Sequence, residues 1–362
     1  MKLQVILSTS LAASTAVANP HLLFRRADAL NGTIPSNLNG TFANKTNSSS
    51  GGNGSHGGNG TGIGSGSGAG SNSTGKLKVI VTGGDVPISD LSSWHDVDVT
   101  QLFNSSSVLN LTELYEVAHE ANTSLSGDQY KGVVIVGNGN SIESLGFLSS
   151  VVLDTVKPVV VTKYVWDGLS IANSTNSMSQ GVVVVGGNNL LYSGVFSPYV
   201  SDNTADEGSG VPIGVWSTNN SLPYWFFAND KTLLLAENST IRTQFSNFTN
   251  SQALSTGSPP AIPIVEDGSI PASLLASVSS FIQGLVVETD GQNTVTGENS
   301  TAPRIPVVYA QGGSLIGYVP VEQVPMGTIA GGYLSPVKAR LLLSIALANG
   351  VSSTADLQSL FY

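Results

Sequence analysis

The stretch KLKVIVTGGDVPISD, which runs from Lys76 to Asp90, decides the expected fold. Its apolar run Leu77–Val81 has the length of a strand and leads directly into the turn TGGD, which ends at Asp85. Such a run is typical of a strand buried on both faces, as in a parallel sheet. Because ligands bind at the carboxyl ends of parallel strands, this glycine-rich turn is a candidate ligand-binding loop.

Strands and helices alternate beyond this stretch. Val-rich runs predict further strands at Gly132–Val136, Pro158–Thr162 and Gly181–Val185. Apolar residues recur with a helical period from Leu111 to Ala121, and Ser141–Leu153 is predicted to be a crossover helix. Strand–helix–strand units of this kind build a doubly wound sheet, so the predicted fold class is α/β with a parallel sheet.

A Pro-rich break at Ser258–Ala261 separates a second unit, so we predict domains at 76–257 and 261–362. Ser335 is a favourable N-cap for a helix that Asn349-Gly350 ends. The other predicted elements are strands at Ile262–Val265, Leu285–Glu288 and Ile305–Tyr309 and helices at Pro271–Gln283 and Ser353–Leu360.

The first 75 residues predict secretion. Residues 1–18 read as a signal peptide, with Lys2, an apolar segment and an Ala16-Val17-Ala18 cleavage site. Arg25-Arg26 is either a processing site or an unprocessed basic pair. Residues 19–75 include a low-complexity Asn/Gly/Ser tract that we expect to be disordered.

Asn-x-Ser/Thr sequons predict a glycoprotein. They begin at Asn31, Asn39, Asn44, Asn47, Asn53, Asn59 and Asn72 in the tract, and at Asn104, Asn110, Asn122, Asn173, Asn219, Asn238, Asn247 and Asn299 beyond it. We expect a secreted protein that is extracellular or held in a cell wall, because no segment is long and apolar enough for a membrane span.

Composition excludes several function classes. The 362 residues carry a net charge of −10, which argues against a nucleic-acid partner. Cysteine is absent, which excludes thiol catalysis, zinc–thiolate sites and iron–sulfur clusters. VIVGNGNSIES lacks the third glycine of a dinucleotide motif, and His95 with Asp96 and Asp98 fits a solvated loop better than a metal site. We therefore expect neither a cofactor nor a metal.

Four segments resemble the L-asparaginase/glutaminase amidohydrolases. VIVTGGDV is similar to the family's first strand and TGGT loop, and GVVIVGNGNSIESLGFLSSVVLDTVKPVVV to its HGTDT region. GVVVVGGNN resembles the next strand, and the Lys-Ala-Arg helix within GTIAGGYLSPVKARLLLSIALANGVSSTADLQSLFY resembles the C-terminal end. The resemblance covers Lys76 to Tyr362, apart from a shortened stretch near 163–180. It implies a larger flavodoxin-like N-terminal domain, a smaller C-terminal α/β domain, and a homo-oligomer, either a dimer or a tetramer.

The resemblance places the family's catalytic residues on positions that this chain fills differently. The threonine of TGGT falls on Asp85, and the Thr-Asp pair of HGTDT falls on Gly139 and Asn140. The family's lysine has no counterpart, since no Lys lies between Lys163 and Lys231. A hydroxyl is a poor nucleophile without proton-transfer partners, so we expect a pseudoenzyme with little or no amidohydrolase activity.

Polar residues near these positions are candidates for binding a small amide or amino acid. They are Thr82, Asp85, Ser106, Ser107, Asn140 and Ser141, with Glu143 and Glu322 at two acidic positions of the family. Each also has a structural interpretation; Glu143, for example, reads as a first-turn acid favoured by the helix dipole. Two alternatives stay open: an active L-asparaginase with a rearranged site, and a structural cell-wall glycoprotein.

Overall fold

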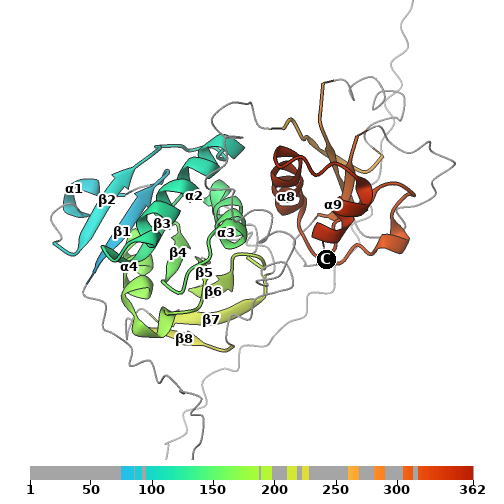
Figure 1. The fold of residues 1–362 in the computed structure, drawn as a ribbon. Helices are drawn as coiled ribbons and strands as arrows, with labels where there is room; N and C mark the ends of the chain where they lie inside the picture. Colours follow the sequence, from blue (N-terminus) through green and yellow to red (C-terminus); the bar gives the residue numbers. More distant parts are fainter. Residues whose placement is uncertain are drawn as a thin grey trace, which may run out of the picture. The chain divides into compact units, whose positions relative to one another are not determined.

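A computed structural model describes residues 75–84, 86–91, 95–186, 189–197, 210–217, 222–227, 260–268, 281–289, 305–312 and 317–361 (Figure 1). The described residues all belong to one unit of the chain, Gly68–Tyr362. The signal peptide and all of the low-complexity tract except Gly75 lie outside the described residues. Within the described part of the chain, no helix has the length and apolar character needed to cross a bilayer.

The larger sheet has eight strands in the order β2-β1-β3-β4-β5-β6-β7-β8. Strands β1 to β5 run parallel to one another. Strands β6, β7 and β8 extend the sheet with antiparallel pairings. Their bounds are β1 Lys76–Val81, β2 Val97–Gln101, β3 Tyr130–Val136, β4 Val159–Thr162, β5 Val182–Val185, β6 Leu190–Ser193, β7 Pro212–Ser217 and β8 Leu222–Trp225. The order 2-1-3-4-5 is that of a flavodoxin-like sheet, which binds ligands where β1 and β3 diverge. The four predicted Val-rich strands are confirmed.

Helices cover both faces of this sheet (Figure 1). On one face, α2 (Leu111–Ser126) and α3 (Gly139–Val152) pack on alternate strand residues such as Ile80 and Ile135. On the other face, α4 (Val165–Asn173) packs on the intervening residues, such as Val79 and Val134. This alternation follows from the two-residue period of a strand and explains why β4 and β5 are buried along their whole length. A short α1 (Ile88–Leu91) follows the loop after β1.

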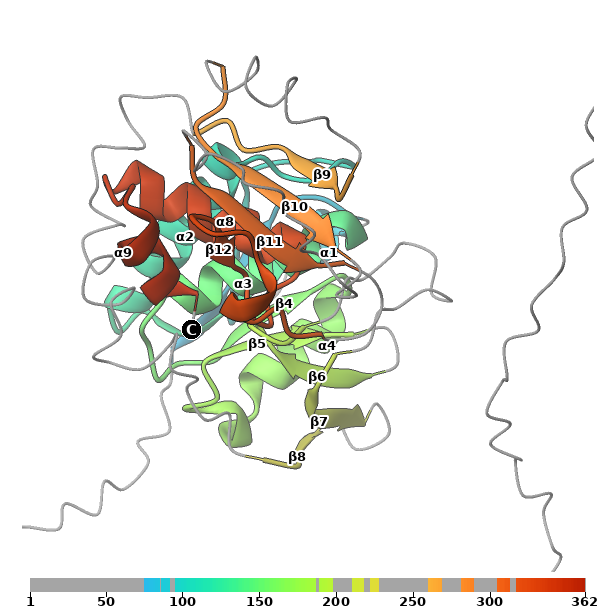
Figure 2. The same ribbon diagram turned by 90° about the vertical axis from the view of Figure 1, so that its right-hand side faces the viewer.

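The second sheet is parallel, with four strands in the order β12-β11-β10-β9. Figure 2 shows it beside helices α8 (Pro336–Ala348) and α9 (Thr354–Leu360). Its strands are β9 Ile264–Glu266, β10 Leu285–Thr289, β11 Val307–Gln311 and β12 Ile329–Ala330. Ser335 caps α8 by accepting a hydrogen bond from the Lys338 N–H, as its sequence predicts. A larger, mainly parallel sheet and a smaller parallel sheet, each packed against helices, confirm the predicted fold class.

Two strand predictions are displaced by prolines. β9 begins after Pro263 and β11 after Pro306, where Ile262 and Ile305 were the expected starts. Proline has no N–H to donate to a strand pairing, so each ladder starts at the next residue.

The predicted helix Pro271–Gln283 is wrong at its end, because Phe281–Gln283 is not helical. Gln283 instead donates its N–H to the Ala261 carbonyl at 3.0 Å and accepts the Ala261 N–H through its side chain at 2.6 Å. Residues 269–280 lie outside the described residues.

Candidate functional site

The loop after β1 starts with a threonine that joins two strands. The Thr82 side chain is fully buried, and its N–H and its hydroxyl both donate to the Val136 carbonyl of β3, at 2.8 and 3.0 Å. The Thr82 hydroxyl therefore links the ends of β1 and β3, at the point where the strand order of the sheet reverses.

The next two residues must be glycine. A methyl group on Gly83 would overlap the Ser105 carbonyl oxygen, and Gly84 has a φ of 82°, in the left-handed region. Ser105 in turn donates its N–H to the Thr82 carbonyl at 3.0 Å. The glycines therefore let the segment after β2 lie directly on the loop after β1.

Two polar side chains at the start of α3 fix this segment. Asn138 donates its Nδ2 to the carbonyls of Ser105 and Ser107, at 2.8 and 2.9 Å. The Ser141 hydroxyl donates to the Ser107 carbonyl at 3.3 Å and accepts the Leu109 N–H at 3.1 Å. Both side chains are buried. The groups at the ends of β1 and β3 are thus bonded to the chain's own backbone.

The remaining predicted site residues lie around this cluster. Ser106 and Ser107 are exposed, and Ser107 enters the cluster through its backbone. Gly139 is buried and Asn140 is half-buried in the first turn of α3. Asp85 lies outside the described residues. Glu322 is exposed in the short 3-10 helix Val321–Gln323.

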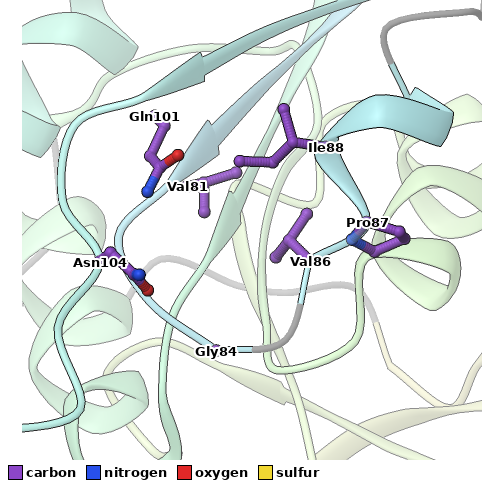
Figure 3. Close-up of a pocket in the computed structure, with 7 residues that line it drawn as sticks. All are labelled: Val81, Gly84, Val86, Pro87, Ile88, Gln101 and Asn104. Carbon is purple, nitrogen blue, oxygen red and sulfur yellow. The ribbon is translucent and has the colours of Figure 1, made fainter.

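An open cavity of about 480 Å³ lies beside the loop at the ends of β1 and β2 (Figure 3). Gln101 and Asn104 line one side, Val86, Pro87 and Ile88 the other, and Val81 and Gly84 complete the lining. None of these described lining residues has a titratable side chain. The volume falls in the range of small-molecule sites, roughly 300–1,000 Å³.

Glu143 corrects a sequence interpretation. It is not a solvated first-turn acid, because it is 4% exposed and accepts a hydrogen bond from the Ser335 hydroxyl at 2.6 Å. Its carboxylate lies 3.7 Å from Nζ of Lys338 on α8, and that ammonium also donates to the Val195 carbonyl at 2.9 Å. Burial lowers the pKa of Lys338, and the Glu143 carboxylate opposes this shift.

Asp98, near His95, belongs to a surface hydrogen-bond network. Asp98 accepts hydrogen bonds from Lys76 at 2.9 Å and from the Tyr130 hydroxyl at 3.0 Å. The hydrogen bond from Lys76 lowers the pKa of Asp98, and partial burial opposes it. In the parts of the chain that the structure describes, no cluster of His, Asp and Glu could hold a metal ion.

Sequence comparison finds two yeast relatives that are each at least 38% identical to the chain. The chain is 38% identical over 375 residues to Protein YGP1 of Saccharomyces cerevisiae, across all of both chains. It is 40% identical over 305 residues to the Sporulation-specific wall maturation protein of that yeast, covering 79% of this chain and 89% of the relative. No protein-family model matches it.

The same yeast's L-asparaginase 2-3 is 24% identical over 292 residues, covering 73% of this chain and 76% of the relative. A probable cytoplasmic L-asparaginase from Campylobacter jejuni superposes with a TM-score of 0.62 at 17% identity, over 80% of this chain and 99% of that one. The chain belongs to the L-asparaginase/glutaminase family. Its two sheets are those of the two-domain asparaginase fold.

Sequence reasoning about this asparaginase-family chain missed two residues. Asn138 occurs in the sequence analysis only within the stretch VIVGNGNSIES, and nothing in the sequence indicates its backbone partners, which lie on another loop. Lys338 had a detectable signal, because Leu341, Leu342 and Ile345 follow it at helical spacing and mark its face of α8 as buried.

Proposed function

We propose that this asparaginase-family chain is a secreted, wall-associated glycoprotein with little or no amidohydrolase activity. The expected signal peptide and the density of sequons support secretion and glycosylation. A relative at 40% identity is named as a sporulation-specific wall maturation protein, which supports a place in the wall. The relatives named as L-asparaginases match at a lower identity of 24%.

The observation that carries the proposal is that the hydroxyls of Thr82 and Ser141 are buried and hydrogen-bonded to the backbone. Thr82 and Ser141 have no exposed surface, and both hydroxyls donate to backbone carbonyls. A nucleophile or substrate contact must instead reach a bound ligand and exchange protons with a base. Using either hydroxyl for chemistry would break a hydrogen bond that holds the end of β1 or β3.

The proton-transfer partners are also absent at the matched positions. Gly139 and Asn140 stand where the family resemblance expects a threonine and an aspartate, and neither can take up a proton as a base. Lys338 cannot substitute for the family's lysine, because it is buried and bound to Glu143 and Val195. Catalytic groups that act as a unit lose most of their rate when one is missing.

The cavity beside Gly84 supports a binding role for the unmodified chain. Its size suits a small amide or amino acid, and Gln101 and Asn104 offer amide donors and acceptors on one side. Without charged groups in the described lining, we expect weak binding of a charged amino acid.

Ammonia release from asparagine and from glutamine tests the proposal. The full chain, purified from a secreting yeast, should match a buffer blank, while an authentic L-asparaginase in the same buffer provides the positive control. Turnover at even about one per second, near the low end of ordinary enzymes, would establish the alternative of an active, rearranged site.

A restoration variant sharpens this test. Asp85→Thr with Gly139→Thr and Asn140→Asp returns the residue types of the family to three positions. We expect it to stay close to the blank, because the lysine is still missing and the groups act together. High activity in this variant would show that the three substitutions alone had removed catalysis.

Fractionation tests the location. Secreted protein should divide between medium and wall, and release from the wall by salt or detergent would indicate binding, whereas release only by glucanase would favour a structural wall glycoprotein. Retention of the whole chain inside the cell would contradict secretion.

We also propose a homo-oligomer, a dimer or a tetramer, on the family resemblance. Sedimentation of deglycosylated protein should give a mass well above the 37.2 kDa of one chain.

A further inference from the structure

The cavity beside Gly84 has a glycosylation sequon in its wall. Asn104, Ser105 and Ser106 form an Asn-Ser-Ser sequon, and Asn104 is one of the residues that line the cavity (Figure 3). Asn104 is exposed, and within the described residues its side chain forms no hydrogen bond. Its amide nitrogen is therefore available for attachment of a sugar.

The backbone on the C-terminal side of Asn104 is fixed. Ser105 donates its N–H to the Thr82 carbonyl at 3.0 Å, and its own carbonyl accepts Nδ2 of Asn138 at 2.8 Å. The contact with Gly83 leaves no room for the segment to move towards β1. The backbone from which the Asn104 side chain extends is consequently held beside the cavity.

The other sequons in the described residues lie elsewhere. Asn110 caps α2 by accepting the Glu113 N–H at 3.0 Å, and Asn122 is half-buried within that helix. Asn173 is exposed at the end of α4. Of these four described acceptors, Asn104 is the one that lines the cavity.

We propose that Asn104 carries an N-linked glycan whose first sugars lie across the cavity and close it to small ligands. The inference rests on the proposed secretion, since the glycan donor is a lipid-linked oligosaccharyl diphosphate of the secretory pathway. A bond forms between Asn104 Nδ2 and the anomeric carbon of the oligosaccharide, the bond from that carbon to the diphosphate oxygen breaks, and Nδ2 loses one proton to the transferring enzyme's base.

This modification also gives Ser106 a role. Ser106 is a predicted substrate contact, yet it is exposed, whereas Asn138 and Ser141 make the side-chain contacts to the neighbouring backbone. As the third residue of the sequon, it supplies the hydroxyl that the glycosyl-transfer reaction requires. The glycan thereby places a bulky polar group two residues from Ser106, a position that the family resemblance makes a candidate for substrate binding.

Occupancy is tested with two variants of one residue. Ser106→Ala abolishes the sequon and Ser106→Thr preserves it, and neither alters Asn104 itself. Glycopeptide mass spectrometry of secreted full chain should find a glycan on Asn104 in the wild type and Ser106→Thr, and none in Ser106→Ala. Asn173→Gln should remove a different glycan and leave Asn104 occupied.

Closure is tested with a single thiol, because the chain has no cysteine. Val86→Cys places a thiol on the wall opposite Asn104, and Ala355→Cys places one on the exposed surface of α9 as a control. Maleimide should label the thiol at position 86 several-fold faster when Ser106→Ala is added, and the thiol at position 355 at an unchanged rate.

Each contrary result has its own meaning. A bare Asn104 in protein whose other sequons are occupied would overturn the inference and leave the proposed function standing. Equal labelling of position 86 with and without the glycan would overturn closure. A chain with no glycan on any sequon would overturn both the inference and the proposed secretion.

Discussion

The Glu143 carboxylate and the Lys338 ammonium lie 3.7 Å apart and pair α3, which packs on the larger sheet, with α8, which packs on the smaller one. Both side chains are buried, each 6% exposed. Ser335, the N-cap of α8, donates to the same carboxylate, and Lys338 donates to the Val195 carbonyl. An ion pair is tolerated in such a place when its remaining hydrogen-bonding groups are satisfied, as they are here.

Glu143→Gln should destabilise the fold strongly. The amide still accepts from Ser335, but the Lys338 ammonium then stays buried without a counter-charge. Breaking a buried pair in this way costs about 3–5 kcal/mol of unfolding free energy, which urea denaturation measures. The matched control is Glu116→Gln on the exposed side of α2, with an expected change within about 0.5 kcal/mol.

The double variant Glu143→Leu/Lys338→Met separates charge from packing. Removing both charges should recover part of the loss, although the Val195 carbonyl then lacks its donor. If Glu143→Gln were as stable as the wild type, the pair would contribute nothing to joining the two helices.

Gly83→Ala should lower stability by about 1–3 kcal/mol, because a methyl group overlaps the Ser105 carbonyl and the overpacked loop must shift. Gly127→Ala is the control, since a methyl group at that position meets no atom within 4 Å and φ is −107°. The melting temperatures of both variants, each compared with the wild type, measure this loss. Equal melting temperatures would mean that the loop after β2 does not rest on Gly83.

The central strands of the larger sheet were predictable because burial on both faces forces a continuous apolar run, as in Val159–Thr162 and Val182–Val185. The antiparallel extension was not, since β7 and β8 mix buried, half-buried and exposed residues and contain proline. Helix α4 was also missed because Gly168 interrupts its pattern. That glycine is required, as a methyl group there would collide with Val134 and Thr162 of the sheet.

The candidate site was predictable only in part. The positions of Thr82 and Ser141 at the strand ends follow from the strand pattern and the family resemblance. The burial of their hydroxyls does not follow from either, because it depends on the segment from Ser105 to Leu109, which follows a different strand, β2. Pairing of Glu143 with Lys338 likewise depends on the packing of α3 against α8, which no local pattern encodes.

Acid should weaken the surface pair of Asp98 and Lys76. The hydrogen bond from Lys76 holds the Asp98 pKa below its ordinary value of 3.8, so the pair's contribution is present above that pH and is lost as pH falls through the folded-state pKa. The two side chains are 31% and 46% exposed, so solvent screens the pair and its contribution at pH 7 is small.

Asp98→Asn should therefore slightly lower the unfolding free energy at pH 7 and leave it unchanged at a pH below the folded-state pKa of Asp98. Asp128→Asn on the exposed surface is the control. Salt at about 1 M should shrink the difference at pH 7, because it screens exposed charges. Urea titrations at both pH values measure it. A loss that grew in acid would contradict the assigned sign.

Ser141→Ala separates a structural serine from a ligand contact. The substitution leaves the Leu109 N–H without its acceptor and removes the donor to the Ser107 carbonyl. An unpaired buried N–H lowers the unfolding free energy by about 1–3 kcal/mol. The higher helix propensity of alanine offsets a few tenths of a kcal/mol of this loss. We expect a net loss of unfolding free energy on the order of 1–2 kcal/mol in urea denaturation of deglycosylated protein.

Ser107→Ala is the matched control for this loss. It keeps the carbonyl that Asn138 and Ser141 bind and removes only an exposed hydroxyl, so its unfolding free energy should stay within about 0.5 kcal/mol of the wild type. Ammonia release should equal the blank for both variants. If Ser141→Ala instead kept full stability and abolished a measurable turnover of asparagine, Ser141 would be a substrate contact and its hydrogen bonds to the 107–109 backbone would be dispensable.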